Sequence, residues 1–247
     1  MWDKPQLMLW MANLLYALAA ILMLYAILFL VIHLPIFPLR EISVNGELKH
    51  VTREQVQYIV RQQLKGNFFT LDLNKSRAAF EKLPWVRTVN VRRRWPDRLD
   101  VSLEEHVELA RWGNAALVNT KGEVFRAASD NRTLPVFVGQ TGNEQEITQH
   151  YLAFKEQLEP LELAPTQVTL SPRHAWQMRL DNGMVIELGR EQVEQRLTKF
   201  IAVYDRTLAK LQRSVQYVDL RYPNGFAVRV PQQQLKGKET VASAQPA

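Results

Sequence analysis

The residue types that most often carry chemistry are sparse in this sequence and form no recognised motif. The chain has no cysteine, which excludes disulfides, thiolate zinc sites and thiol nucleophiles. Its five histidines lack the His-x-x-x-His and His-Glu-x-x-His spacings of helical metal sites. Glycine-rich phosphate loops and the Gly-x-Ser-x-Gly elbow are also missing. These absences give no evidence for an enzyme, although a dispersed active site would leave no local motif. We expect no catalytic or metal-binding residue and no cofactor.

One acidic cluster, Glu104–His106, has the composition of an acid/base pair. It follows an alternating segment that predicts a strand, and clusters at the end of a strand are usually solvated. We interpret Glu104–His106 as a solvated sheet edge.

The densest basic run is Arg92–Trp95. On a strand, Arg92 and Arg94 share one face and Arg93 takes the other, so the basic stripe is only two residues wide. That is too narrow to indicate nucleic-acid binding. A solvated sheet face near anionic lipid is the simpler interpretation, and the net charge of +6 suits an anionic membrane surface or acidic partner segments.

A long apolar segment decides where the protein is located. No Asp, Glu, Lys or Arg lies between Lys4 and Arg40, and every residue of Leu14–Ile32 is apolar or Tyr. A helix of this length is about 28 Å long, close to the thickness of the hydrocarbon core. It is longer than the apolar region of a cleaved secretory signal. We expect a short tail at 1–10 and one retained transmembrane helix at 11–33.

The orientation of this helix is not fixed by charge, because Lys4 precedes it and Arg40, Lys49 and Arg53 follow it. Long domains cross the membrane largely regardless of charge. We therefore expect the large C-terminal region on the outer side.

The segment 37–106 predicts a small α+β domain. Residues 40–45 alternate and end in Asn-Gly, Thr52-x-x-Gln55 forms a capping box, and a second helix precedes Pro84. Two alternating strands follow, up to 94 and from 99. The order is β-α-α-β-β.

The segment 107–231 predicts a strand-rich β domain with two helices. A hairpin is predicted at 176–188 around Asn182-Gly183, and a last hairpin at 216–230 around Asn224-Gly225. Apolar stripes at 147–158 and 193–211 predict the helices. Residues 232–247 are polar and unpatterned, and we expect them to be disordered.

The order of these elements resembles the FtsQ family of bitopic bacterial division proteins, over nearly the whole chain. The most specific match is similar to that family's POTRA-domain signature, and its residues are Pro84, Trp85, Val86, Arg94, Trp95 and Pro96. In the second region the similar motifs are Leu188-Gly-Arg190, Arg196-Leu-x-x-Phe200, Asp219-Leu-Arg-Tyr222 and Asn224-Gly-Phe-Ala-Val228.

The resemblance implies a single-pass inner-membrane protein with a cytoplasmic N-terminus and a periplasmic C-terminal region, located at the division septum. It implies a scaffold that is not an enzyme and has no small-molecule substrate. This scaffold would bind FtsB and FtsL and other divisome proteins, link cytoplasmic to periplasmic division proteins, and help control divisome assembly. The POTRA signature would serve structure or recruitment.

The family's FtsB contact lies in and before its last strand. Carried over residue by residue, the resemblance nominates Arg221, Tyr222, Asn224, Gly225, Phe226, Val228 and Val230, together with Arg173 and His174 before Trp176. The family pattern has Arg where this chain has His174, and Trp where it has Val230. An edge strand followed by Pro231 could accept a partner strand through its main chain.

Two other functions stay open. The chain could be a POTRA-type adaptor for secretion or outer-membrane assembly, which predicts further POTRA repeats or a barrel. It could also be a membrane-tethered cell-wall enzyme, which predicts a deep pocket with paired carboxylates.

Overall fold

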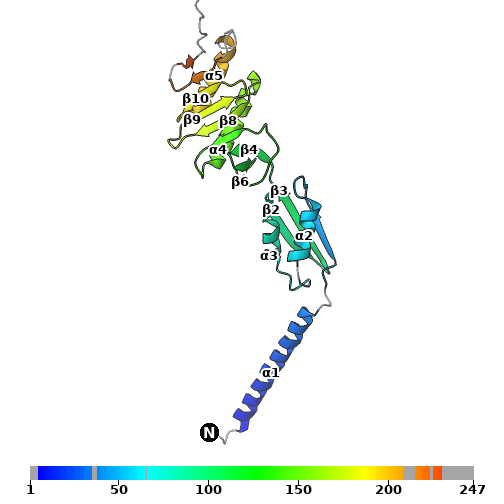
Figure 1. Ribbon diagram of the computed structural model, residues 1–247. Coiled ribbons are helices and arrows are strands. Elements are labelled where there is room, and N and C mark those ends of the chain that lie inside the picture. Colours follow the sequence, from blue (N-terminus) through cyan, green and yellow to red (C-terminus); the bar gives the residue numbers. More distant parts are fainter. Residues whose placement is uncertain (1–4, 35–37, 65, 208–214, 223–224, 230–247) are drawn as a thin grey trace, which may run out of the picture. The chain divides into compact units, whose positions relative to one another are not determined.

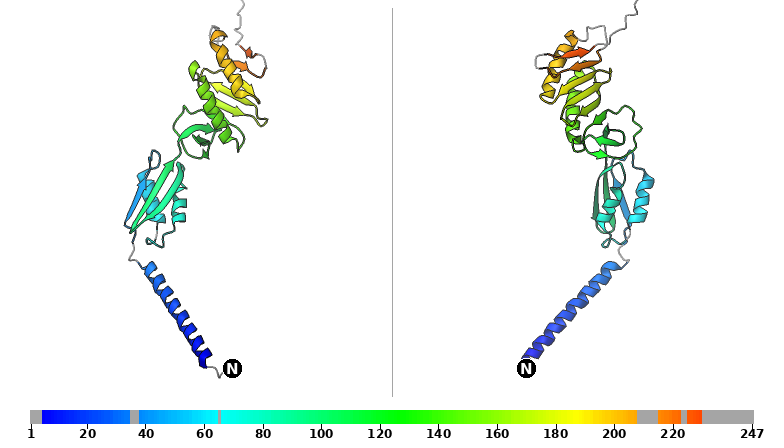
Figure 2. Two further views of the ribbon diagram at one scale, coloured as in Figure 1. Left: turned by 180° about the vertical axis from the view of Figure 1, so that it is seen from behind. Right: turned by 60° about the vertical axis from the view of Figure 1, so that its left-hand side comes forward.

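The computed structural model of the chain describes residues 5–34, 38–64, 66–207, 215–222 and 225–229 (Figures 1 and 2). It divides into two compact units, Met1–His106 and Val107–Ala247. The expected α+β fold class is confirmed: one apolar N-terminal helix precedes a β-α-α-β-β domain and a strand-rich domain with helices.

The apolar segment forms α1 (Pro5–His33). Within the described residues it is the one helix long and apolar enough to cross a membrane, over Met8–His33. The helix begins six residues before the predicted position 11. Proline is favoured in the first turn of a helix, and no breaker stands between Pro5 and Met11, so the expected tail is partly helical.

The domain predicted at 37–106, the expected POTRA domain, contains β1 (Glu41–Asn45), α2 (Arg53–Gln63), α3 (Leu73–Phe80), β2 (Val86–Arg94) and β3 (Arg98–Glu105). Its sheet has the order β1-β3-β2, with β1 parallel and β2 antiparallel to β3 (Figure 1). The predicted capping box of α2 is confirmed, with Thr52 accepting from the backbone of Gln55 and Gln55 accepting from the backbone of Thr52.

The core of the POTRA domain lies between the two helices and one face of the sheet. Alternate residues of β2 and β3 point into this core and pack against α2 and α3. The buried residues of the helices and strands include Val56, Ile59, Phe80, Val89, Leu99, Val101 and Leu103. The other face carries polar residues, including Arg92 and Arg94, as the predicted alternation requires.

Within its described residues, the β domain forms a nine-stranded sheet of order β12-β11-β10-β9-β8-β7-β4-β5-β6. Its strands are β4 (Glu108–Trp112), β5 (Ala116–Asn119), β6 (Val124–Phe125), β7 (Val136–Val138), β8 (Pro165–Leu170), β9 (Trp176–Leu180), β10 (Val185–Gly189), β11 (Tyr217–Asp219) and β12 (Ala227–Arg229). The predicted hairpin around Asn182-Gly183 is present as β9 and β10.

Two helices, α4 (Glu144–Leu158) and α5 (Val193–Thr207), lie on the same side of this sheet in both views of Figure 2. A short 3-10 helix, η1 (Glu159–Leu161), follows α4. The buried face of α4 includes Ile147 and Phe154, and α5 contributes Leu197 and Phe200. The helical predictions are therefore confirmed, although the end of the predicted stripe, with Leu208 and Leu211, lies outside the described residues. The expected tail at 232–247 lies outside them as well.

Candidate functional site

The last described strand, β12, lies at the edge of the nine-stranded sheet. It pairs antiparallel with β11, with Tyr217 opposite Arg229 and Asp219 opposite Ala227. No other described strand pairs with its outer edge. The edge therefore presents main-chain N–H and C=O groups in the arrangement that accepts an added strand.

The side chains of β12 alternate between the domain core and the outside. Phe226, just before the strand, and Val228 are half-buried and pack against the core; the ring of Phe226 lies 5.8 Å from that of Phe200. Ala227 and Arg229 are exposed. Phe226 and Val228, both nominated as contacts, pack partly against the core, so their side chains help to hold the strand in place.

Arg229 is exposed on β12 but was not among the contact residues that the sequence nominated. Its guanidinium lies 5.5 Å from the ring centroid of Tyr217 on the neighbouring strand. Its place in the alternation of β12 was the available signal, because residues 227 and 229 take the face opposite to Val228.

Tyr222 stands beside a hollow at the end of the sheet. It is 56% exposed, so it is not a core residue. The hollow has a volume of about 540 Å³ and lies between α5 and a group that includes Leu220, Tyr222 and Gly225. Its lining residues are Gln192, Arg196, Lys199, Phe200, Val203, Leu220, Tyr222, Gly225 and Phe226. Among the described residues, the lining contains two cations and no carboxylate, which suits an acidic and partly apolar segment.

Arg221 is held by Asp219. Its Nε donates to both carboxylate oxygens at 2.9 and 3.1 Å, and its Nη2 donates to Oδ2 at 2.7 Å. The backbone N–H of Arg221 also donates to Oδ1 at 3.0 Å. These hydrogen bonds lower the pKa of Asp219, in spite of its burial, and raise the pKa of Arg221. Arg221 therefore presents a fixed guanidinium with one exposed side.

Gly189, at the end of β10, makes room for two arginines. Its φ of +82° lies in the left-handed region, and a Cβ there would stand 2.7 Å from Nη1 of Arg196 and 3.1 Å from Cγ of Arg221. The same Nη1 donates to the carbonyl of Leu188 at 2.7 Å. The motif around Gly189 thus has a packing reason, and Arg196 contributes positive charge near Asp219.

Arg173 and His174 lie at the same end of the sheet as Arg221. Trp176 at the start of β9 pairs with Gly189, and Glu187 of β10 pairs with Asp219 of β11. Since only β10 separates them, the strands β9 and β11 are roughly 10 Å apart across the sheet. Both side chains are exposed, and His174 has a φ of 54° in the turn before β9. The other two nominated residues, Asn224 and Val230, lie outside the described residues.

Within the POTRA signature, Trp85 and Val86 pack against the core of the domain. Val86 is buried. The Trp85 ring stacks on His50 with centroids 3.6 Å apart, and its carbonyl accepts from the N–H of His106 at 2.8 Å. Pro84 is exposed in the turn before β2. The remaining signature residues are exposed: Arg94 ends β2, and Trp95 and Pro96 lie in the turn before β3.

The interpretation of Glu104–His106 as a solvated edge is wrong for Glu105. The side chain of Glu105 is only 6% exposed and accepts from the backbone N–H groups of Lys49, His50 and Val51. Burial alone would raise the pKa of Glu105, but these donors outweigh it and the pKa is lowered. A carboxylate that accepts hydrogen bonds from the backbone of a loop more than fifty residues away leaves no local signal in the sequence. Glu104 is half-exposed and pairs with Arg87 at 3.0 Å.

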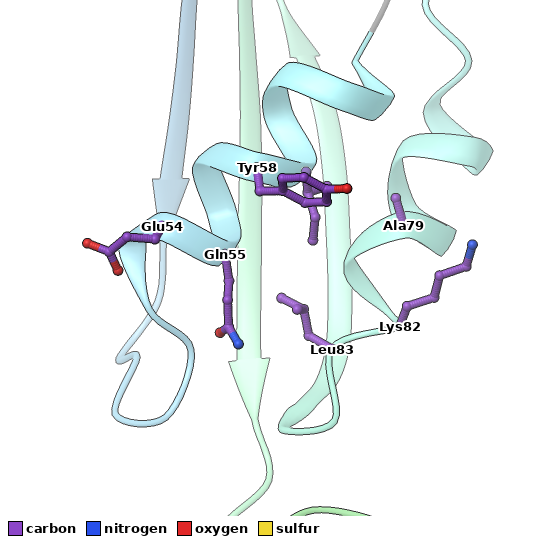
Figure 3. A pocket seen from close by; sticks show the side chains of 7 residues that line it. Glu54, Gln55, Tyr58, Ala79, Lys82 and Leu83 are labelled. Carbon is purple, nitrogen blue, oxygen red and sulfur yellow. The ribbon is translucent and has the colours of Figure 1, made fainter.

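Two further hollows bear on the enzyme alternative. One lies between α2 and α3 of the POTRA domain, and in Figure 3 its two charged residues, Glu54 and Lys82, stand on opposite sides and point apart. The other, at the end of α4, is bordered by Glu156, Glu159 and Glu162, all of them exposed. Among the described residues there is no group of three or more His, Asp or Glu arranged to hold a metal ion.

Both regions of the chain match known families. Residues 37–106 match the POTRA domain of FtsQ type, and residues 110–221 match the C-terminal region of cell division protein FtsQ/DivIB. The cell division protein FtsQ of Nitrosospira multiformis is 46% identical over 234 residues, which cover 93% of this chain and 99% of that protein. The chain belongs to the FtsQ/DivIB family of cell division proteins.

Other FtsQ proteins are similar over comparable lengths. That of Burkholderia pseudomallei is 41% identical over 93% of this chain and 94% of its own length, and that of Neisseria gonorrhoeae is 33% identical over 97% and 99%. Residues 107–231, which the adaptor alternative would fill with further POTRA repeats or a barrel, thus largely match the C-terminal region of FtsQ/DivIB instead.

Proposed function

We propose that this division protein is a non-catalytic scaffold whose β domain binds FtsB, and through it FtsL, at the outer edge of β12. One observation carries the proposal: β12 is an edge strand next to the exposed Tyr222 and a hollow lined by Arg196 and Lys199. A partner strand would gain main-chain hydrogen bonds along β12, and its acidic side chains would meet the arginines at the same end of the sheet.

Tyr222 is the anchor in this arrangement. A large amphipathic side chain that is already half-exposed can be covered by a partner without reorganising the core. Arg221 is held in one orientation by Asp219, so little side-chain freedom is lost when a partner carboxylate approaches its exposed side. Arg173 and His174 would extend the contact across β10.

Hydrogen exchange on the full-length chain in nanodiscs tests the edge directly. Addition of the soluble part of FtsB from the same organism should slow exchange in Ala227–Arg229. Exchange in β6 (Val124–Phe125), at the opposite edge of the same sheet, should stay unchanged. Binding without protection of β12 would place the interface elsewhere, and absence of binding with FtsL also present would refute the scaffold.

We further propose that the N-terminus is cytoplasmic and that residues 37–231 work in the periplasm at the division septum. In this placement the scaffold links cytoplasmic to periplasmic division proteins and takes part in divisome assembly. Because the chain has no cysteine, a single Thr141→Cys substitution at an exposed loop position supplies a clean topology probe. A maleimide reagent that cannot cross the inner membrane should label this cysteine in cells with a permeable outer membrane. Labelling only after lysis would reverse the orientation, and a fluorescent fusion that spreads evenly around the cell would contradict septal placement.

A further inference from the structure

Trp95 is the most exposed large apolar side chain that the structure describes outside α1, at 80% exposure. It stands in the turn between β2 and β3, whereas Trp85 of the same signature is partly buried on His50. Indole rings are favoured at the headgroup level of a bilayer, where the apolar ring is shielded and its N–H stays hydrated.

This turn is tied to the chain that leaves the membrane. The N–H of Arg40 donates to the carbonyl of Asp97 at 3.0 Å, and Arg98 pairs in register with Glu41. Only five residues lie between Leu34, next to the end of α1, and Arg40, and the six residue-to-residue steps from Leu34 to Arg40 can span at most about 21 Å. Whatever orientation the POTRA domain takes, its β2–β3 turn stays within reach of the bilayer.

A second exposed aromatic belongs to the same end of the domain. The segment after α2 is joined to the linker by a bridge between Pro38 and Asn67. Arg93 of β2 donates to the carbonyls of Phe69 and Leu71, which fixes this segment to the β2–β3 hairpin. The side chain of Phe69 is 45% exposed. Two partly or largely exposed aromatics thus flank the hairpin end nearest the linker.

The charge at this end is positive. Five arginines, namely Arg40, Arg92, Arg93, Arg94 and Arg98, stand with three acids, namely Glu41, Asp97 and Asp100. The acids form ion pairs at 3.0–3.9 Å with Arg98, Arg40 and Arg94, whose side chains are about half to three-quarters exposed. Such exposed pairs are weak, so the guanidinium groups can turn to lipid phosphates, which they bind well.

We propose that the turn between β2 and β3 is a second membrane contact, in which Trp95 lies among the headgroups and the flanking arginines bind the phosphates of anionic phospholipids. The occupant is the bilayer leaflet at the C-terminal end of α1. This contact limits the orientations that the linker would otherwise allow the POTRA domain. It is independent of the binding edge at β12.

Quenching of Trp95 by lipid tests this contact in the full-length chain. Trp2 and Trp10, in or near α1, are replaced by Phe so that they do not respond. The protein is placed in nanodiscs of phosphatidylcholine alone or with phosphatidylglycerol, in each case with brominated acyl chains. The fluorescence of a Trp95→Phe version is subtracted to isolate Trp95. We expect the Trp95 signal to fall about twofold with phosphatidylglycerol present and much less without it.

A pair of variants separates the arginines from general charge. Arg92→Gln with Arg94→Gln should abolish the dependence on phosphatidylglycerol. Arg53→Gln, at the start of α2 beside the opposite end of β3, should leave it unchanged. Unquenched Trp95 in every lipid would refute the contact. Equal quenching with and without phosphatidylglycerol, or persistence of the effect in the double variant, would refute its anionic character. Even if the double variant fails to fold, the lipid comparison on the chain with both arginines decides whether Trp95 contacts the bilayer.

Discussion

Asp219 and Arg221 are two residues apart and are joined by three side-chain hydrogen bonds of 2.7–3.1 Å. The carboxylate is 8% exposed, whereas the guanidinium is 58% exposed. Asp219 is therefore buried in the β domain, whereas Arg221 lies at its surface beside Tyr222. This asymmetry makes different predictions for substitution of the two residues.

Asp219→Asn should destabilise the β domain, because the neutral amide loses charge-assisted hydrogen bonds while its site stays buried. We expect the free energy of unfolding to fall by about 1–2 kcal/mol. This is a small effect for a buried carboxylate, because its partner Arg221 is well solvated. Arg221→Gln should change stability less than Asp219→Asn. Thermal denaturation of the full-length chain in detergent measures both. A larger loss for Arg221→Gln would mean that the arginine is the structural partner.

The two buried carboxylates make stability sensitive to acid. The pKa values of Asp219 and Glu105 are both lowered in the folded protein, so the unfolded chain binds more protons as the pH falls. Their stabilising effect is complete above the unfolded pKa values of about 3.9 and 4.3 and disappears as the pH falls through the folded values.

Glu105→Gln should weaken this acid sensitivity and also cost about 1–3 kcal/mol near neutral pH, since three backbone donors would lose a charged acceptor. Glu104→Gln is the matched control, because Glu104 is half-exposed and pairs with Arg87 on the surface. Urea denaturation at a series of pH values between 3 and 7 gives the slope of the free energy of unfolding against pH. An unchanged slope for Glu105→Gln would show that Glu105 is not responsible.

Gly189→Ala should disturb the end of the β domain where Arg196 and Arg221 lie. The substitution carries a penalty for its φ of +82°, and its Cβ would also press on Arg196 and Arg221. We expect a loss of about 1–3 kcal/mol in stability. Gly183→Ala separates the two causes, because Gly183 has nearly the same φ, +83°, and nothing within 4 Å of the added Cβ. Equal losses at both positions would leave backbone strain as the whole effect.

The sequence was sufficient to predict what depends on local patterns. The apolar segment, the capping box of α2, the β-α-α-β-β order and the hairpin at Asn182-Gly183 all follow from periodicity and turn chemistry over a few residues. The orientation of Arg92 and Arg94 opposite to Arg93 followed from strand alternation alone.

Contacts between distant segments were beyond such patterns. Glu105 was assigned to solvent because its donors, Lys49 to Val51, are far away in sequence. Likewise, the register that turns Phe226 and Val228 inward depends on pairing with β11 and packing on Phe200. The resemblance to a family nominated the residues, but only the structure separates the exposed Tyr222 from the side chains that hold β12 in place.

Binding of the full-length chain in nanodiscs to the soluble part of FtsB, measured by calorimetry, tests the proposed scaffold most directly. The wild type should show saturable binding, which Tyr222→Ala should weaken at least about tenfold while stability changes by less than about 0.5 kcal/mol. Tyr58→Ala, which removes an exposed tyrosine from the POTRA domain, should bind like the wild type. Equal binding by all three folded proteins would contradict an interface at Tyr222 and β12.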